Sequence, residues 1–344
     1  MAYKLFALSC LFSLILISCN GKKEAPKDGM AEMSPVAESE LLAKAKTIFG
    51  VLPDKMPGTE GDTPELIALG KKLYNETKLS TTGTQSCATC HDLTKGGVDN
   101  KATSPGAKDG LSGTRNSPTV LNAGYQFVQF WDGRAKDLVE QAKGPILNPV
   151  EMAMKTDKDV EKTIAGIPEY KDMFAKAFPV DKNPVTYDNL AKAIAAFERT
   201  LISRSRYDQW LAGNKSALTP AEKMGMKHFF DANCTICHIG PLLGGGMYQK
   251  MGLVKPYANT KDMGRFDVTK VESDKYMFKV AQLRNVAITG PYFHDGKAVT
   301  LEEAIKTMGD IQLAKALTPM EIEHIAAFLK ALTDVDLEKT LVKK

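Results

Sequence analysis

The chain has 344 residues, of which 43% are hydrophobic and 25% charged, and its formal net charge is +4. This composition is typical of a globular protein, and the length allows about two domains of ordinary size. The net charge is small for this length, and acidic and basic residues are interspersed. We therefore expect no nucleic-acid partner and no polybasic membrane patch.

The first residues predict an export signal. One lysine is followed by an apolar run over residues 5–17, too short to span a bilayer comfortably. The run ends in LISC, which resembles the lipobox of bacterial lipoproteins. We expect residues 1–18 to be removed and lipid on Cys19 to tether the protein in the periplasm. A plain signal peptide with an incidental Cys19 is the alternative. Residues 19–40 are predicted to form a flexible tether.

Once Cys10 and Cys19 are set aside, four cysteines remain. They form two C-x-x-C pairs, each followed directly by histidine, in SCATCHDL at residues 86–93 and NCTICHIG at residues 233–240. C-x-x-C-H is the attachment signature of c-type haem, because two thiols one turn apart reach both vinyl groups and the histidine binds iron. The motifs predict two haem c groups, one held by Cys87, Cys90 and His91 and one by Cys234, Cys237 and His238.

A zinc site or disulfides are the alternatives for these cysteines. Ribbon-type zinc sites keep their two pairs about 15 to 20 residues apart. Here the pairs lie in opposite halves of the chain, and each is followed by histidine. Covalent haem is therefore the preferred interpretation.

The two halves of the chain resemble each other beyond these motifs. TPELIALGKKLY at residues 63–74 and TPAEKMGMKHFF at residues 219–230 both begin with a Thr-Pro helix start and continue as amphipathic helices. FWDGRAKDL at residues 130–138 and FHDGKAVTL at residues 293–301 form a second matching pair. A repeat of this size indicates two copies of one domain.

Helical periodicity dominates the remaining sequence, and no convincing alternating strand is present. The predicted fold is all-α, with two cytochrome c-like domains that each bind one haem c. We place the N-terminal domain at residues 41–200, joined by the C-terminal tail at 335–344. The C-terminal domain is placed at residues 201–334.

Differences between the copies are expected to carry the function. Beyond the Asp-Gly turn, the second copy offers Met308 where the first offers Glu151. A thioether completes a six-coordinate iron and raises its potential, whereas a carboxylate can move protons beside an open iron. Core packing is the alternative for Met308, with Met251 and Met277 as rival ligands. A solvated loop acid is the alternative for Glu151.

His294 and Trp131 occupy the same position in the two copies. Apart from those of the haem motifs, all histidines lie in the second half. We expect His294 to line a haem rather than bind its iron.

Over residues 41–333 the sequence resembles the bacterial di-haem cytochrome c peroxidases. The resemblance rests on CATCH, RNSPTVLNA, QFWDGRA, GPILNPVEM, CTICHIGP, LRNVAITGPYFHDG and MGDIQL. It implies that hydrogen peroxide is reduced to water at the N-terminal haem. Electrons would reach the C-terminal haem from a small periplasmic donor, either a mono-haem cytochrome c or a blue-copper protein. A homodimer and a calcium ion between the domains are also implied.

The resemblance further implies a role for individual residues. These are His91 as proximal ligand of the peroxidatic haem, Glu151 as its acid and base, Trp131 between the haems, His238 and Met308 as axial pair of the second haem, and Asn116 with the carbonyls of Thr289 and Pro291 as calcium ligands. Packing between domains is the alternative for Trp131.

One loop departs from the family pattern. Many members carry a histidine before the N-S-P-T segment, and it caps the peroxidatic iron in the fully oxidised protein. Here the loop reads TSPGAKDGLSGTRNSPT, with Ala107 and Lys108 at the expected place. We expect an iron that is permanently open, or capped by water, Lys108 or Met152.

Two other functions are considered. The related methylamine-utilisation di-haem oxidase modifies tryptophans of a partner protein and has tyrosine over its second haem. Met308 argues against it, whereas the missing histidine favours it. A non-enzymatic electron shuttle or sensor is the second alternative, and the Glu151 segment counts against it.

Overall fold

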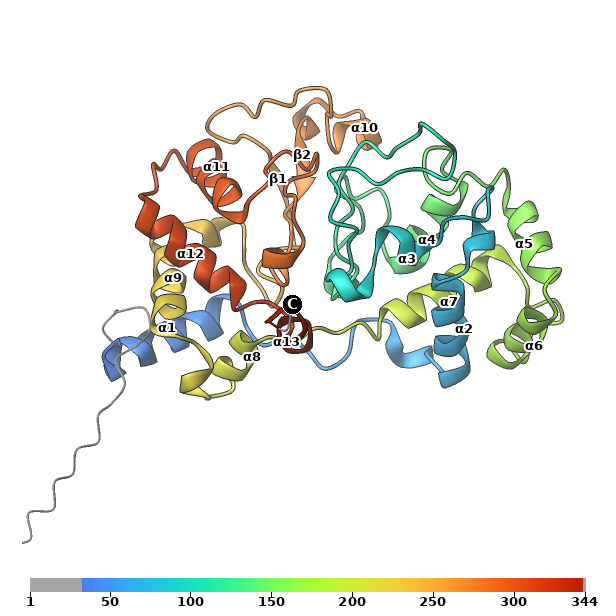
Figure 1. Cartoon of the computed structure of the whole chain (residues 1–344), viewed down its shortest axis with the longest axis horizontal. Helices are drawn as coiled ribbons and strands as arrows, with labels where there is room; N and C mark the ends of the chain where they lie inside the picture. Colours follow the sequence, from blue (N-terminus) through green and yellow to red (C-terminus); the bar gives the residue numbers. More distant parts are fainter. Residues whose placement is uncertain (1–32, 343–344) are drawn as a thin grey trace, which may run out of the picture.

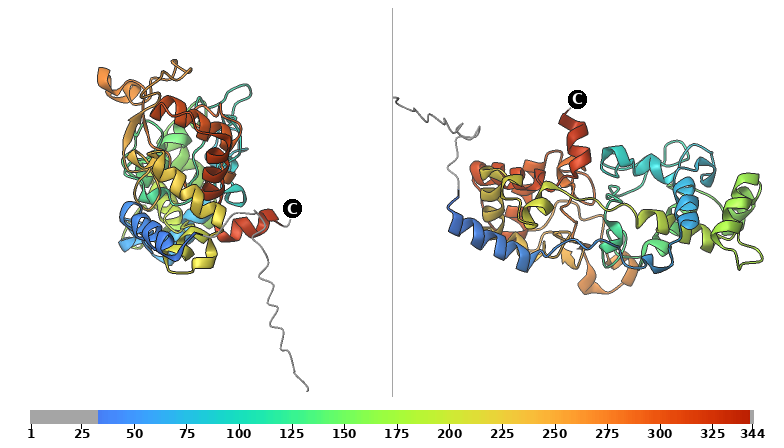
Figure 2. Two further views of the ribbon diagram at one scale, coloured as in Figure 1. Left: turned by 90° about the vertical axis from the view of Figure 1, so that its left-hand side faces the viewer. Right: turned by 90° about the horizontal axis from the view of Figure 1, so that it is seen from below.

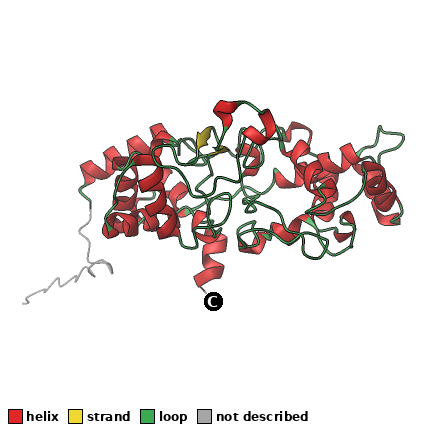
Figure 3. Ribbon diagram, turned by 90° about the horizontal axis from the view of Figure 1, so that it is seen from above, coloured by secondary structure: helices red, strands yellow, loops and turns green. Residues whose placement is uncertain are grey.

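The computed structural model describes residues 33–342. The predicted signal peptide, Cys19 and most of the predicted tether lie outside these residues. Figure 1 shows two helical lobes side by side, and Figure 3 shows loops running between them. The described chain is mainly helical, and its sheet is one antiparallel pair of short strands. The prediction of a helical protein is thus confirmed.

The first lobe is formed by helices from the first half of the chain, on the right in Figure 1. These helices are α2 (Pro64–Tyr74), α3 (Cys87–Cys90), α4 (Leu138–Leu147), α5 (Asp157–Ala165), α6 (Pro168–Ala177) and α7 (Tyr187–Glu198).

The second lobe combines helices from the second half with the first described helix. Its elements are α1 (Pro35–Ile48), α8 (Arg206–Leu211), α9 (Pro220–Asp231), α11 (Leu301–Leu313), α12 (Pro319–Lys330), β1 (Tyr248–Lys250) and β2 (Met277–Lys279). Two further helices, α10 (Phe266–Thr269) and α13 (Val335–Val342), lie near the middle of the molecule in Figure 1.

The repeated Thr-Pro segments begin helices as predicted. The Thr63 hydroxyl accepts a hydrogen bond from the backbone N–H of Leu66, and Thr219 accepts one from Glu222. The Glu222 carboxylate in turn accepts from the backbone N–H of Thr219 at 2.8 Å. These caps satisfy amide groups that the first helical turn leaves unpaired.

Each lobe is organised around one close crossing of two helices. Gly70 on α2 lies against the carbonyl of Ala193 on α7, and a Cβ on Gly70 would lie 1.8 Å from that oxygen. Gly225 on α9 faces the carbonyl of His324 on α12, and a Cβ there would also lie 1.8 Å from the oxygen. The two copies therefore share a backbone contact as well as sequence motifs.

Apolar side chains surround both crossings. The first core includes Leu69, Leu73, Ile164, Phe174 and Ile194, and the second includes Phe49, Trp210, Met226, Phe229 and Phe328. Fully burying such a side chain contributes about 1.5–3 kcal/mol relative to leaving it exposed. The glycine contacts thus hold together the two largest apolar cores.

Helix α1 differs from its predicted assignment. It begins inside the predicted tether, and Leu41 and Ala45 pack in the second core rather than in the N-terminal domain. The Phe49 ring stacks on Phe230 with the ring centroids 5.3 Å apart. Figure 2 shows α1 running along the second lobe. The sequence boundary was wrong here because the apolar face of α1 matches a core formed much later in the chain.

The C-terminal tail also differs from its predicted position. The backbone N–H of Val335 donates to the carbonyl of Arg204 at 3.0 Å, and the Arg206 guanidinium pairs with Glu338 at 3.0 Å. Helix α13 therefore lies against the segment that opens the second half, not against the first-lobe core.

None of the helices within residues 33–342 is both long and apolar enough to cross a membrane.

We predict that Gly70→Ala and Gly225→Ala each lower the free energy of unfolding by about 1–3 kcal/mol or more, because overpacking forces two backbones apart. Urea unfolding followed by circular dichroism measures the change. Gly61→Ala is the matched control, since a Cβ added at Gly61 would meet no atom within 4 Å. Equal midpoints for all three variants would contradict the role of the crossings.

Candidate active site and its companion cavity

The two C-x-x-C-H motifs lie in separate cavities, one in each lobe. The first cavity has a volume of about 1710 Å³ and the second about 1210 Å³, including solvent space at their mouths. The first is lined by Cys87, Cys90, His91, Trp131, Arg134 and Glu151, among others. The second is lined by Trp131, Cys234, Cys237, His238, His294 and Met308, among others. The structure thus brings most predicted site residues together in two groups.

Both motif histidines are oriented in the same way. Nδ1 of His91 lies 3.3 Å from the carbonyl of Gly97, and Nδ1 of His238 lies 2.9 Å from the carbonyl of Leu243. A ring N–H directed at a carbonyl leaves Nε2 as the basic nitrogen that can bind a metal. Burial lowers the pKa of both rings and favours this neutral form.

The four cysteines of the motifs are free thiols in the structure. Cys87 begins the short helix α3, and Cys234 begins a 3₁₀ turn at Cys234–Ile236. Within residues 33–342, no three His, Cys, Asp or Glu side chains gather as a metal cluster. The two pairs therefore do not form a shared zinc site, whereas a pair, a histidine and a large apolar cavity fit a covalently held haem.

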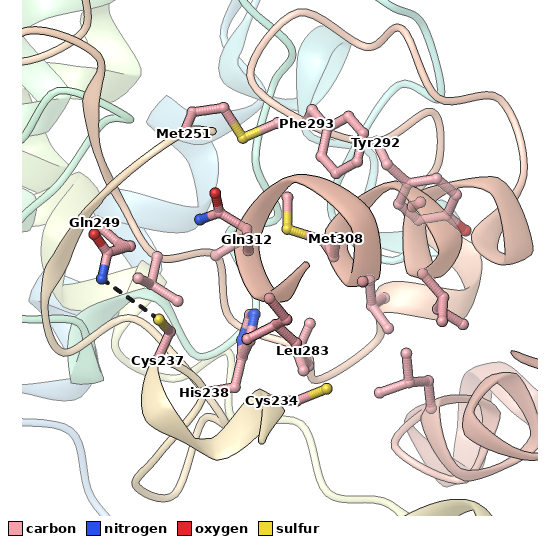
Figure 4. Close-up of a pocket in the computed structure, with 18 of the residues that line it drawn as sticks. Cys234, Cys237, His238, Gln249, Met251, Leu283, Tyr292, Phe293, Met308 and Gln312 are labelled. Atoms are coloured by element: carbon pink, nitrogen blue, oxygen red, sulfur yellow. Dashed lines mark hydrogen bonds between the residues drawn. The ribbon is translucent and has the colours of Figure 1, made fainter. Parts of the chain in front are cut away.

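Figure 4 shows the second cavity, with His238 and both cysteines on one side and Met308 and Met251 on the other. Met308 projects from α11, and both methionines line the cavity. Met277, the other rival ligand considered from sequence, does not line it. His294, which is 2% exposed, also lines the cavity, and its ring stacks on Phe278 with centroids 4.1 Å apart.

Glu151 lies in the wall of the first cavity, in the turn after α4. Its Oε1 accepts a hydrogen bond from the Asn148 amide at 3.1 Å. Burial raises the pKa of this carboxyl, although Arg134 and Asn148 oppose the shift. A carboxyl with a raised pKa in a cavity wall is a candidate for general acid–base chemistry.

The loop that departs from the family pattern is folded against Glu151. The N–H of Ala107 donates to the Glu151 carbonyl at 2.6 Å, and the loop is closed by a bond from Gly106 N–H to the Leu111 carbonyl at 2.8 Å. Lys108 is exposed and does not line the cavity, whereas Met152 is buried in its wall.

Trp131 is shared by the two cavities. Its Nε1–H donates to the Asn116 carbonyl at 2.9 Å, and its own carbonyl accepts from the Lys279 backbone at 2.7 Å. The indole is thus held by the first half of the chain, and the backbone of Trp131 by the second. Packing between the lobes, the alternative considered for this residue, is compatible with the same geometry.

The three oxygens assigned to calcium accept no hydrogen bond within the described chain. Asn116 uses its amide nitrogen to donate to Lys101, which leaves its Oδ1 available. The Asn100 amide donates to the carbonyls of residues 288 and 290, and it does not bond to the carbonyls of Thr289 and Pro291. Unpaired amide and carbonyl oxygens are the donors that a hard cation prefers.

Sequence reasoning missed a buried ion network beside the first cavity. The Arg115 guanidinium binds Asp132 at 2.5 Å and Asp262 at 2.7 Å, and the latter lies 147 residues away in sequence. Arg284, the counterpart of Arg115 in the second copy, likewise binds Asp208 at 2.7 Å. The segments RNSPTV at residues 115–120 and RNVAIT at residues 284–289 both begin with Arg-Asn, but the sequence does not indicate which distant carboxylates pair with these arginines.

Comparisons with known proteins agree with this geometry. A family model for the di-haem cytochrome c peroxidases matches residues 64–216. Cytochrome c551 peroxidase of Pseudomonas aeruginosa is 47% identical over 308 residues, which cover 87% of this chain and 88% of that protein. Cytochrome c551 peroxidase of Nitrosomonas europaea is 50% identical over 277 residues, covering 79% and 81% respectively.

More distant relatives include methylamine utilization protein MauG of Methylorubrum extorquens, which is 33% identical over 300 residues, 86% of this chain and 83% of that protein. Among solved structures, a MauG-like protein associated with microbial copper homeostasis superposes with a TM-score of 0.75 at 28% identity. That match covers 83% of this chain and 94% of the other.

The fold, the cavities and these similarities define a haem c-containing oxidoreductase. The chain belongs to the di-haem cytochrome c peroxidase family. It is a cytochrome c peroxidase, an enzyme that acts on hydrogen peroxide. The family expected from the sequence motifs is therefore confirmed.

We predict that Arg115→Gln lowers the free energy of unfolding by about 3–5 kcal/mol at pH 7, because it leaves the largely buried carboxylate of Asp262 unpaired, whereas Asp132 keeps Arg134. Burial alone would raise the pKa of Asp262, but Arg115 outweighs burial and lowers it. A lowered carboxyl pKa stabilises the fold above the unfolded pKa, and this contribution is lost as pH falls through the folded value.

The stability difference between wild type and Arg115→Gln should therefore shrink below about pH 4, the unfolded pKa of aspartate. Urea midpoints measured from pH 3 to 7 check this expectation. Lys227→Gln, which breaks an exposed pair with Asp231, should cost at most about 1 kcal/mol at any pH. A pH-independent difference for Arg115→Gln would contradict the assignment.

Proposed function

We propose that peroxide is reduced in the first cavity and that electrons enter through the second. The observation that carries this proposal is the difference between two copies of one site. The first copy places Glu151, a carboxyl with raised pKa, in the cavity wall, whereas the second places the thioether of Met308. One site can therefore exchange protons, and the other is suited to electron transfer.

Each lobe is proposed to be a cytochrome c-like domain with one haem c, attached through Cys87 and Cys90 in the first and Cys234 and Cys237 in the second. When bound, haem supplies the iron that exchanges electrons with peroxide. His91 and His238 would present Nε2 to that iron, because their Nδ1 atoms face backbone carbonyls.

Glu151 is proposed to move the protons of the reaction. Reduction of hydrogen peroxide to two waters consumes two protons and two electrons. A carboxylate oxygen of Glu151 can accept a proton from one peroxide oxygen and return it to the other as the bond between them breaks. Asn148 holds Oε1 in place, and the raised pKa makes Glu151 a better proton acceptor than an exposed carboxylate.

We predict that Glu151→Gln lowers kcat/KM for peroxide by about 10²- to 10⁴-fold, because the amide cannot exchange a proton. Steady-state turnover with a reduced cytochrome c measures the change, and absorption spectra check that haem content is retained. Glu65→Gln, an exposed acid-to-amide change on α2, is the control and should leave turnover unchanged. Full activity in Glu151→Gln would reassign the proton carrier.

The second site is proposed to receive electrons from a small cytochrome c or a blue-copper protein. His238 and Met308 would be its axial pair, and Trp131 would lie on the route to the first cavity. Two exposed apolar side chains, Ile236 at 60% and Ile239 at 45% exposure, flank His238 and could contact such a donor. The names of the relatives from Pseudomonas and Nitrosomonas contain cytochrome c551, which supports a cytochrome donor.

Calcium is proposed to bind through Asn116 of the first half and the carbonyls of Thr289 and Pro291 of the second. Support comes from the three oxygen atoms that no described donor uses.

The remaining expectations concern location and assembly. We propose a periplasmic, lipid-tethered homodimer, on the basis of the N-terminal signal and the family.

We further propose that the enzyme needs no preliminary reduction. His91 is the sole histidine in the first half of the sequence, and the loop beside Glu151 carries Ala107 and Lys108 in place of the family histidine. Lys108 is not among the residues that line the cavity, which leaves water or Met152 as the remaining caps.

We predict that the fully oxidised enzyme and the half-reduced enzyme react with peroxide at rates within a few-fold of each other. Stopped-flow absorption of the two forms measures both rates. Lys108→Gln should change neither rate, while Met152→Leu should change the oxidised rate if the thioether caps the site. A large acceleration on half-reduction, in wild type and both variants, would show that another latch operates.

The methylamine-utilisation type of oxidase is a second candidate because its relatives also match over most of the chain. Lower identity and the presence of Met308 in the second cavity argue against it. An electron shuttle without peroxide chemistry is disfavoured by the ionisable wall of the first cavity.

A further inference from the structure

The first cavity contains a second buried acid. Glu198 ends α7, is 4% exposed and lines the cavity together with Ile194, one turn earlier. Its Oε2 is buried and has no hydrogen-bond partner within the described chain. The peroxide mechanism proposed above does not use this carboxyl.

The internal repeat shows that this acid is specific to one copy. Ala193 and His324 make the same glycine contact, so α7 and α12 are in register. In that register Glu198 corresponds to Leu329, and Ile194 to Ile325. Ile325 and Leu329 line the second cavity just as Ile194 and Glu198 line the first. The fold therefore accepts leucine at this position, and packing alone does not require an acid.

No described cation neutralises Glu198. The adjacent Arg199 is turned to Asp62, with both of its hydrogen bonds to that carboxylate at 2.6 Å. From α2 and α3, Tyr74 and Cys87 face Glu198, and burial together with the charge of Glu198 raises the pKa of both groups.

The other residues of the cavity wall form no ion pair with Glu198. Helix α4 contributes Gln141, Ala142, Pro145 and Ile146, none of which is ionisable. Glu151, Arg134, Arg115, Asp132 and His91 are the other charged or titratable groups on the wall, with Cys90 and Asp267. No ion pair joins Glu198 to any of them.

A buried carboxylate without a partner is costly, so the neutral acid is favoured until a positive charge comes close. Burial raises the pKa of Glu198 to about 8, and Arg199 opposes this only in part. A haem iron that loses an electron gains one positive charge within the same cavity.

We propose that Glu198 couples the redox state of the first haem to one proton. The carboxylate takes up a proton from solvent when the iron gains an electron from the second haem, and releases it when the iron is oxidised. The charge inside the cavity then stays constant through the electron step. This inference rests on the proposed haem at Cys87, Cys90 and His91.

The test is a spectroelectrochemical titration of both haems in the holoenzyme from pH 5.5 to 9.5. For wild type, we expect the potential of the first haem to fall with pH over a window near neutral pH. If one proton is taken up per electron, the potential falls by at most about 59 mV per pH unit, which is a tenfold change in the redox equilibrium. Glu198→Gln and Glu198→Leu should flatten this slope, while the second haem, which faces Leu329, should not change.

Glu151→Gln separates the two acids, because it should retain the slope. A redox-difference infrared spectrum supplies a second readout. A protonated-carboxyl band should appear on reduction in wild type and Glu151→Gln, and should be missing in Glu198→Gln. If the Glu198 variants lose haem, the band in Glu151→Gln decides the question alone.

An unchanged slope in Glu198→Gln, or the absence of a carboxyl band in Glu151→Gln, overturns the inference. The proposed function still stands in that case if the wild type contains two haems and turns over peroxide. Absence of haem from the first motif in wild type would overturn both.

Discussion

Two backbone contacts determine the architecture of this protein. Gly70 and Gly225 let a helix approach the carbonyl of a second helix more closely than any side chain permits. The crossing fixes which residues of the later helix turn toward the cavity, because positions one and five residues after the contact lie on the same face. The walls formed by α7 and α12 therefore have the same geometry, and the side chains at corresponding positions of these helices set the chemistry of each wall.

The differences between the copies are few and chemically consistent. The first cavity is lined by two acids, Glu151 and Glu198, whereas the second is lined by the thioether of Met308 and, at the position that corresponds to Glu198, by Leu329. Charged groups in a low-dielectric wall strongly affect proton and electron equilibria. In the proposed function, these few differences between two similar sites separate proton chemistry from electron supply.

Local features could be predicted from the sequence, and long-range ones could not. The Thr-Pro caps, the haem motifs and the repeat each depend on residues within one helix turn or on direct sequence likeness. Asp262, one of the two partners of Arg115, lies 147 residues away, and the packing of Leu41 depends on a core from the opposite half. The burial of Glu198 could not be predicted, because an acid in an amphipathic helix is normally expected on the solvent-exposed face.

The placement of α1 has a consequence for the order in which the chain folds. The first lobe is built from one continuous stretch, so its contacts are local and can form as soon as that stretch is available. The second lobe needs α1 from the beginning of the described chain and α12 from near its end. The apolar face of α1 therefore stays exposed until α12 is available. A chaperone that binds exposed apolar segments would be most useful during this interval.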